Sequence, residues 1–366
     1  MNKYFFLYLY IFIVCLCSIS CRSNSSSGDS KKKCPDANDT ISISSGSGNF
    51  TISDNTISFL VHALNKENQT PIFEEFKNPL GEQENSILDP GGFGWRTTNY
   101  SNIFFPLSDN QSYQVRIGTW NFKVKDSELI CLTTRSGTIS NIPRIKVQPY
   151  ITGSTFTSDS IIPALDIMKS IYSNNGVTLD VHETITLDES KFTKVSPDFT
   201  NKITSEMVSK GDKDKVNLFF ITDYSDNTSY LGNAAGIPGS QGLKGSHNGV
   251  LINLSAHKTG ENLDDQLLGE TAGHEMGHFL GLFHPSESKA KYFDPITDKP
   301  ENYFDPIADT PECTSGQIST LDCENQGANN LMFWTAYSIL EKNNGKKQDN
   351  LTEGQVYVLK RALIAK

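Results

Sequence analysis

Residues 274 to 284 read His-Glu-Met-Gly-His-Phe-Leu-Gly-Leu-Phe-His, and this stretch predicts the fold around it. His274 and His278 are four residues apart, so on a helix they project from one face and can bind one metal ion. Gly281 allows the chain to leave the helix sharply, because glycine tolerates positive φ. That turn would bring His284 back as a third ligand. The stretch therefore predicts a metal-binding helix that ends at a glycine turn.

Three histidine ligands are typical of a catalytic zinc site, which keeps one coordination position open. Glu275 follows the first histidine, where its carboxylate can reach a metal-bound water without binding the metal. The chain has only 7 histidines in 366 residues, which makes a chance match to the long motif rare. We therefore interpret His274, His278 and His284 as zinc ligands and Glu275 as the catalytic residue.

A second signal lies downstream, where residues 329 to 334 place Met332 in a turn-like setting. A long zinc motif followed by such a methionine turn resembles the metzincin clan of metallopeptidases. The zinc motif, Asp309-Thr310-Pro311, Asn330-Leu331-Met332 and Leu351-Thr352-Glu353-Gly354-Gln355 together resemble the pappalysin family. The resemblance covers roughly residues 150 to 366.

The resemblance implies a zinc-dependent endopeptidase that hydrolyses peptide bonds in extracellular proteins. In such an enzyme Glu275 would accept the proton of a zinc-bound water and return it to the leaving amine. Related enzymes often have a tyrosine two residues after the methionine, where this chain has Trp334. An indole has an N–H but cannot act as a phenol. Trp334 and Tyr337, three residues further, are therefore candidates for stabilising the oxyanion.

Composition limits the partners of this chain. Its net charge of −10 and pI near 5.2 argue against nucleic acid or an anionic membrane as the main partner. Its length allows two domains, and its 37% hydrophobic content can supply their cores. A protein or peptide substrate agrees with these properties.

The N-terminus has the pattern of an export signal. Residues 1–20 combine Lys3, a short apolar stretch and small residues before a cleavage site, which predicts a signal peptide. The ending Ser18-Ile19-Ser20-Cys21 resembles a bacterial lipoprotein signal, in which Cys21 would carry the lipid. Residues 21–35 would then be a flexible tether to the membrane. We expect a lipoprotein of the bacterial outer membrane or cell surface, with a secreted protein as the alternative.

Four cysteines remain after the signal segment and Cys21, an even number with three possible pairings. We favour Cys313–Cys323, a short loop beside the catalytic region, and Cys34–Cys131, which would close the first domain. An oxidising compartment permits both disulfide bonds.

Residues 36–145 consist of short alternating runs separated by Gly, Asn, Ser and Asp, which predicts a β-sandwich-like accessory domain. Residues 146–366 alternate strands and helices in an order that resembles a metzincin. We expect strands at 145–152, 177–187, 216–223 and 249–255, a helix at 161–172, a helix at 263–280 capped by Asn262, and a final helix at 352–365. The predicted fold class is α/β (α+β). Residues 231–238 would form an open sheet edge that can pair with an extended peptide.

After His284 the chain contains a near repeat, at 292–301 and 303–312, which a local duplication explains simply. Its carboxylates offer an alternative, a structural calcium site, because calcium prefers several oxygen ligands. The candidate ligands are Asp294, Asp298, Asp305 and Asp309.

Two further interpretations stay open. The protein could be a catalytically silent adhesin or binding lipoprotein, although Glu275 argues against this because a binding protein needs no general base. Alternatively, residues 34 to about 150 could be an inhibitory pro-segment in which the thiolate of Cys34 or Cys131 caps the zinc. A spacer or binding module is the other role for this segment.

Overall fold

The computed structural model describes part of the chain, and residues 33–366 cluster into one compact unit. The described residues are 34, 36–42, 46–65, 71–84, 101–226, 228–286, 292–293, 300–301, 305–312, 327–336 and 347–366. The signal peptide and several predicted site residues lie outside them: Cys21, Asp294, Asp298, Cys313, Cys323 and Tyr337. Within the described ranges, no helix is both long enough and apolar enough to cross a membrane.

The first part of the chain forms two antiparallel sheets. The strands are β1 (Asp39–Ser42), β2 (Ser47–Ile52), β3 (Thr56–Asn65), β4 (Ile72–Lys77), β5 (Ser101–Phe105), β6 (Gly118–Lys125) and β7 (Ser127–Ser136). Their order is β1-β7-β3-β5 in one sheet and β2-β6-β4 in the other. Buried and exposed residues alternate along β6, as expected for a strand with one face in a core.

An aromatic core joins these two sheets. Phe59 of β3 and Trp120 of β6 are fully buried, with ring centroids 5.1 Å apart. Phe105 of β5 lies 5.0 Å from the same Trp120 ring. Large aromatic side chains provide much of the apolar area that such a small core can bury. The packing agrees with the β-rich character predicted for residues 36–145.

The predicted disulfide bond between Cys34 and Cys131 is present, with the two Cα atoms 5.6 Å apart. It ties the start of the described chain to β7. Because both sulfur atoms are in this bond, neither is a thiolate. The structure therefore contradicts a pro-segment that caps the metal with Cys34 or Cys131.

The second part of the chain is built on a mainly parallel sheet. Its strands are β8 (Arg144–Thr152), β9 (Thr178–Val181), β10 (Ile185–Leu187), β12 (Val216–Ile221), β14 (Gly232–Ala234) and β15 (Val250–Asn253). Their order is β10-β8-β12-β15-β14, and β9 also pairs with β8. β14 is antiparallel to β15 and lies at the end of this order, where the sequence predicted a sheet edge. The single strand expected at 177–187 is divided into β9 and β10.

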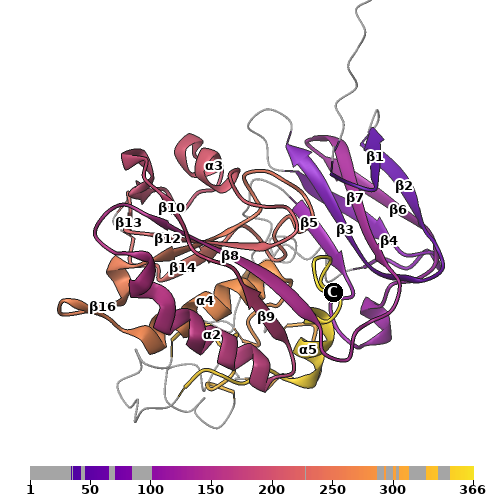
Figure 1. Ribbon diagram of the computed structural model, residues 1–366. Helices are drawn as coiled ribbons and strands as arrows, with labels where there is room; N and C mark the ends of the chain where they lie inside the picture. The colour runs from indigo at the N-terminus through magenta and orange to yellow at the C-terminus, as the bar shows by residue number, and fades with distance from the viewer. Residues whose placement is uncertain are drawn as a thin grey trace, which may run out of the picture. The chain divides into compact units, whose positions relative to one another are not determined.

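Helices cover both faces of this sheet. Figure 1 shows α2 (Ile162–Asn174) and α4 (Asp265–Phe279) on one side and α3 (Lys202–Val208) on the other. Every residue of β12 is buried, and its side chains alternate between the two cores. Phe220 belongs to the core beneath α2 and α4, and Phe219 belongs to the core beneath α3. Apolar residues throughout a strand are typical of a sheet covered on both faces.

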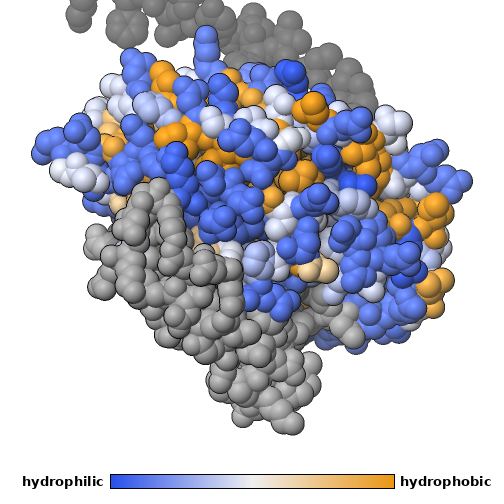
Figure 2. All heavy atoms as spheres, turned by 90° about the horizontal axis from the view of Figure 1, so that it is seen from below, coloured by the Kyte–Doolittle hydropathy of each residue, from blue (hydrophilic) through white to orange (hydrophobic). Residues whose placement is uncertain are grey.

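Short elements complete the fold. They are η2 (Gln111–Tyr113), η3 (Ser158–Ile161), η4 (Ser190–Phe192), β11 (Lys194–Val195), β13 (Asp223–Tyr224), η5 (Ser255–His257), β16 (Lys258–Thr259), β17 (Asn262–Leu263), β18 (Tyr292–Phe293), β19 (Pro300–Glu301) and α5 (Glu353–Leu359). The face shown in Figure 2 is mainly hydrophilic, with scattered apolar residues. Such a surface agrees with the low mean hydropathy of the chain, −0.38.

Two helix boundaries differ from the sequence prediction. α4 is capped by Asp264, whose Oδ1 accepts a hydrogen bond from Leu267 N at 3.0 Å, whereas Asn262 lies in β17. Leu267 is the third residue after Asp264, and an N-cap side chain accepts a hydrogen bond from the N–H of the second or third residue after it. α5 ends at Leu359 instead of continuing to residue 365. Arg135 binds the carbonyl oxygens of Lys360 and Ala362, so the chain beyond α5 is held by a side chain of β7.

The two parts share their cores. Leu60 and Phe104, from β3 and β5, pack in the core that contains α2 and α4. Phe283, directly after the glycine turn of the zinc motif, packs in the aromatic core of the two sheets. Asn102 of β5 also donates a hydrogen bond to Pro238 O at 3.0 Å. The domain boundary at residue 145 stays a prediction.

Candidate metal centre

The helix α4 places the first two histidines, and a glycine turn places the third. His274 and His278 are one turn apart on α4, as the motif predicted. Gly281 has φ of +106°, a conformation that side chains disfavour. Its N–H donates to His278 O at 2.9 Å, and Leu282 N donates to Gly277 O at 2.9 Å. This bonding closes the helix and returns His284 to the face that carries the other two histidines.

The three imidazole rings meet at one point. His284 Nε2 lies 3.1 Å from His274 Nε2 and 3.0 Å from His278 Nε2. Among the described residues, these histidines form the one group of three or more His, Cys, Asp or Glu side chains that could hold a metal ion. Two nitrogens each about 2.0 Å from one tetrahedral zinc ion are themselves about 3.3 Å apart. The spacing of the donor atoms therefore fits zinc.

Hydrogen bonds at the opposite ring nitrogens fix the tautomers. His274 Nδ1 donates to Leu331 O, and His278 Nδ1 donates to Leu282 O, each at 2.7 Å. Burial lowers the pKa of His278 well below its usual value, which favours the neutral ring. In a neutral ring with a proton on Nδ1, Nε2 carries only a lone pair. Lone pairs that converge at this distance repel unless a cation lies between them, so the site suits a divalent metal.

Glu275 points from α4 towards the edge of the sheet. Its carboxylate accepts a hydrogen bond from Ala234 N of β14. Burial raises the pKa of Glu275 to about 7, while His284 and this hydrogen bond oppose the rise. A side-chain methyl at Gly232 would lie 2.6 Å from Glu275 Cγ, so only glycine lets β14 approach the carboxylate this closely. The edge strand β14 therefore contacts Glu275 directly and fixes the position of its carboxylate.

The methionine turn lies beneath the metal-binding helix. Met332 is fully buried, and its Sδ leaves no room for a side chain at Gly277 of α4. Its backbone N–H donates to Asn330 Oδ1 at 2.9 Å. The Asn330 and Gln355 side-chain amides exchange two hydrogen bonds, of 2.8 Å and 3.1 Å.

The amide pair links α5 to the metal centre. Leu331, which accepts the His274 hydrogen bond, is the residue between Asn330 and Met332. The motifs on which the resemblance to pappalysins rests include both Asn330 and Gln355, but the sequence gave neither a role in the site. Only the fold brings residues 25 positions apart into contact. The amide pair therefore holds the carbonyl that orients a metal ligand.

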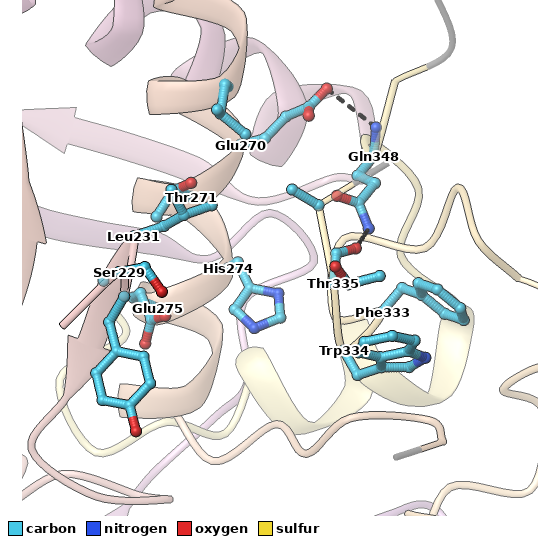
Figure 3. Close-up of a pocket in the computed structure, with 14 residues that line it drawn as sticks. Ser229, Leu231, Glu270, Thr271, His274, Glu275, Phe333, Trp334, Thr335 and Gln348 are labelled. Carbon is cyan, nitrogen blue, oxygen red and sulfur yellow. Dashed lines mark hydrogen bonds between the residues drawn. The ribbon is translucent and has the colours of Figure 1, made fainter. Parts of the chain in front are cut away.

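A cavity of about 290 Å³ opens beside His274 and Glu275. Figure 3 shows residues of α4 along one side and Phe333, Trp334, Thr335 and Gln348 along the other. Ser229, Tyr230, Leu231 and Gly232 also line it, so the sheet edge belongs to its wall. The sequence named Trp334, whose Nε1 has no hydrogen-bond partner among the described residues. The sequence analysis did not identify Tyr230, Glu270 and Gln348 as cavity residues, because no local sequence motif includes them.

Two of the four candidate calcium ligands, Asp305 and Asp309, are described, and both accept hydrogen bonds within the protein. Asp309 Oδ2 accepts a hydrogen bond from Gly354 N at 2.8 Å, in the first turn of α5. Asp305 is buried and accepts a hydrogen bond from the Thr310 hydroxyl. Neither is part of a three-ligand group in the described residues. Calcium binding stays a prediction without support here.

Sequence comparison supports the chemistry of this centre. Residues 159–285 match the model of the Reprolysin-like metallopeptidases, family M12B. The matched segment contains α2, the strands of the sheet from β9 to β15, α4 and all three histidines, whereas β8 precedes it. It ends before the methionine turn. No curated protein matches the sequence.

Three solved structures with some similarity are described as an archaemetzincin, a zinc-dependent peptidase and a metalloproteinase. Archaemetzincin from Methanopyrus kandleri has 16% identity and a TM-score of 0.26, over 38% of this chain and 76% of that chain. A zinc-dependent peptidase from Methanocorpusculum labreanum has 10% identity and a TM-score of 0.32, over 58% and 99%. Metalloproteinase-II from Bacteroides fragilis has 17% identity and a TM-score of 0.26, over 40% and 45%.

Proposed function

We propose that the protein is a zinc-dependent endopeptidase of the pappalysin type that hydrolyses peptide bonds in extracellular proteins. The observation that carries the proposal is the convergence of the Nε2 atoms of three histidines, two of which donate a hydrogen bond from Nδ1 to a backbone carbonyl. The match to a metallopeptidase family over residues 159–285 supports the same chemistry. The neighbouring Glu275 supplies the group that hydrolysis requires.

In the proposed mechanism His274, His278 and His284 would hold the zinc ion. When bound, zinc polarises the carbonyl of the peptide bond and lowers the pKa of its water. Glu275 would accept a proton from the attacking water at its carboxylate and then give it to the leaving amine. Glu275 must be deprotonated before the first transfer and protonated before the second. Ala234 N holds the carboxylate in place through its hydrogen bond.

The sheet edge supports an extended peptide as the substrate. β14 pairs with β15 on one side, and Gly232 of β14 lines the cavity on the other. An extended peptide can bind such an edge through main-chain hydrogen bonds, with side chains directed alternately into pockets. This binding places a peptide bond beside Glu275 without a requirement for a free terminus, which supports endopeptidase activity.

Export as a lipoprotein is part of the same proposal. Its support is the apolar segment before Cys21 in the sequence, together with the Cys34–Cys131 disulfide bond, which is typical of an oxidising compartment. Expression with labelled palmitate should label the wild-type protein in the membrane fraction, and Cys21→Ala should abolish the label. An unlabelled wild-type protein in the medium would favour the secreted form.

Glu275→Gln tests the catalytic proposal. The variant keeps the size of the side chain but cannot accept the proton, so we expect cleavage of a denatured protein to fall by about 10²–10⁴-fold. Bound zinc, measured by mass spectrometry of the metal, should stay at the wild-type level. The exposed Glu261→Gln is the control, and it should retain activity. Wild-type protein that contains zinc but cleaves no internal peptide bond would instead favour the silent adhesin.

A further inference from the structure

We propose that Phe283 is a positioning residue for the third metal ligand, and that the aromatic core of the first two sheets thereby belongs to the metal centre. Phe283 directly precedes His284 in the sequence. The inference rests on the proposed peptidase function only for its effect on turnover, because metal binding can be measured without a substrate. It assigns to the first part of the chain a role other than a spacer, a binding module or a removable pro-segment.

The side chain of Phe283 lies in the aromatic core between the two antiparallel sheets. Only 5% of the residue is exposed. Among the described residues, every other buried member of this core lies between Phe50 and Leu132. Phe283 therefore extends from the part of the chain that carries the zinc motif into the core of the other part. A buried ring in a close-packed core fixes the main chain to which it is attached.

The residues before Phe283 are held from two sides. A side chain at Gly281 would lie 3.2 Å from Cδ1 of Phe104, so this ring of β5 packs directly against the glycine turn. Leu282 packs in the other core, which contains α2 and α4. Consecutive side chains thus enter two different cores. This arrangement leaves the next residue, His284, little freedom of position.

The loop between β14 and β15 connects the end of α4 to β5. Gly239 N and Gln241 Nε2 donate hydrogen bonds to the carbonyl oxygen of Phe279, the last residue of α4, at 3.0 Å and 3.2 Å. Asn102 of β5 donates a hydrogen bond to Pro238 O in the same loop, at 3.0 Å. The end of the helix and the segment that follows it are therefore both attached to the first two sheets.

Metal coordination makes the position of His284 demanding. A zinc site requires donor distances within about 0.2 Å of their usual values. His274 and His278 lie on one helix, so their mutual spacing does not depend on the aromatic core. The third donor is placed by a chain that has already left the helix. Since the surroundings of a deleted core side chain relax in part, loss of the Phe283 ring would move His284.

Phe283→Ala and Phe73→Ala provide a matched pair of variants. Phe73 is 2% exposed and lies in the same core, on β4. Each variant removes one buried ring, so we expect similar losses of thermal stability. Only Phe283→Ala should weaken zinc binding, by about 10- to 100-fold, as is typical when a group that orients a metal ligand is lost. Competition with a zinc-binding dye measures the affinity at a temperature at which both variants are folded.

Cobalt substitution tests the geometry of the site. The visible absorption of Co²⁺ depends on the number and arrangement of its ligands, so Phe283→Ala should change the spectrum and Phe73→Ala should keep it. Phe283→Leu fills most of the space and should restore part of the zinc affinity and of the spectrum. In peptide hydrolysis, kcat should fall in Phe283→Ala while KM stays near the wild-type value, because the substrate contacts are elsewhere.

The outcomes separate this inference from the proposed function. Wild-type zinc affinity and an unchanged cobalt spectrum in folded Phe283→Ala would overturn the inference, and so would an equal loss of zinc affinity in Phe73→Ala. If Phe283→Ala does not fold, Phe283→Leu is compared with Phe73→Leu, and equal zinc affinities in this pair would overturn it. If these differences are found but the wild type cleaves no peptide, the peptidase proposal fails and the positioning role stands.

Discussion

Two regions of the molecule contain a buried histidine at α4. One is the metal centre, with His278 of α4, and the other is the turn η5, which ends at His257. Both regions contain a ring whose Nδ1 binds a backbone carbonyl, Leu282 O for His278 and Asn253 O for His257. Burial lowers the pKa of both rings. The difference lies at Nε2. His257 Nε2 is 2.9 Å from the Thr271 hydroxyl, whereas the Nε2 of His278 faces another histidine nitrogen.

The comparison shows that burial and a neutral ring do not identify a metal ligand. A histidine with both nitrogens bound to protein groups has no lone pair to offer, and its role is to join two elements. His257 connects η5 to α4 in this way. In the histidine triad the Nε2 atoms face one another, and the convergence of three such nitrogens defines the candidate metal site.

Replacement of one histidine in each region should separate these roles most clearly. His284→Ala removes a ligand, so we expect loss of bound zinc and a fall in peptidase activity of about a thousandfold or more. His257→Gln should retain zinc. Metal analysis after dialysis and hydrolysis of a fluorogenic peptide measure both effects. Loss of zinc from the His257 variant alone would contradict the comparison.

Gly232→Ala should affect catalysis without affecting the metal. The added methyl would lie 2.6 Å from Glu275 Cγ and 3.1 Å from Leu251 O, so the carboxylate must move away from β14. Displacement of a catalytic group by about 1 Å can reduce the rate by about a hundredfold. Zinc content should not change. Gly273→Ala on α4 is the control, because its methyl meets ordinary contacts of 3.5 Å or more, and unimpaired activity in Gly232→Ala would argue against the tight fit.

Asn330→Ala tests the link from α5 to the metal centre. Loss of the amide pair leaves Leu331 O less firmly held, and we expect zinc affinity to weaken by about tenfold. Gln355→Ala should have a similar effect, and the double variant should be little worse than either one. Competition with a zinc-binding dye measures the affinity. The helix cap Asn201→Ala of α3 should reduce stability by about 1 kcal/mol and leave zinc affinity unchanged.

The smallest effect concerns His257 and pH. Burial lowers the pKa of His257 from 6.5 to about 4. The unfolded chain therefore binds more protons between these values, and the free energy of unfolding falls as the pH drops from 6.5 towards 4. In the His257→Gln variant the free energy of unfolding should fall less steeply over this range. The two slopes should differ by at most about 1.4 kcal/mol per pH unit. Urea unfolding of the metal-free proteins would show this, and equal slopes would refute it.

Local sequence patterns predicted that His274, His278 and His284 converge, because that geometry is local. The four-residue spacing of His274 and His278 fixes their common face, and Gly281 has the positive φ that the third histidine requires. The prediction of the cap at Asn262 was wrong because Asp264 has the same capping ability and sits at the correct distance from Leu267 N. Similarly, α5 ends early because Arg135, distant in sequence, binds the following carbonyls.

The sequence by itself determined the metal-binding helix, the histidine set, Glu275 and the alternation of strands and helices, because each depends on neighbours within a few residues. Tertiary structure alone decided which groups surround that set. Asn330 meets Gln355, Gly232 meets Glu275, and Glu270 meets Gln348 only after sheet and helices have packed. These contacts join residues far apart in the chain, and their cost in chain entropy is offset by the core as a whole. No local sequence pattern predicts these long-range contacts.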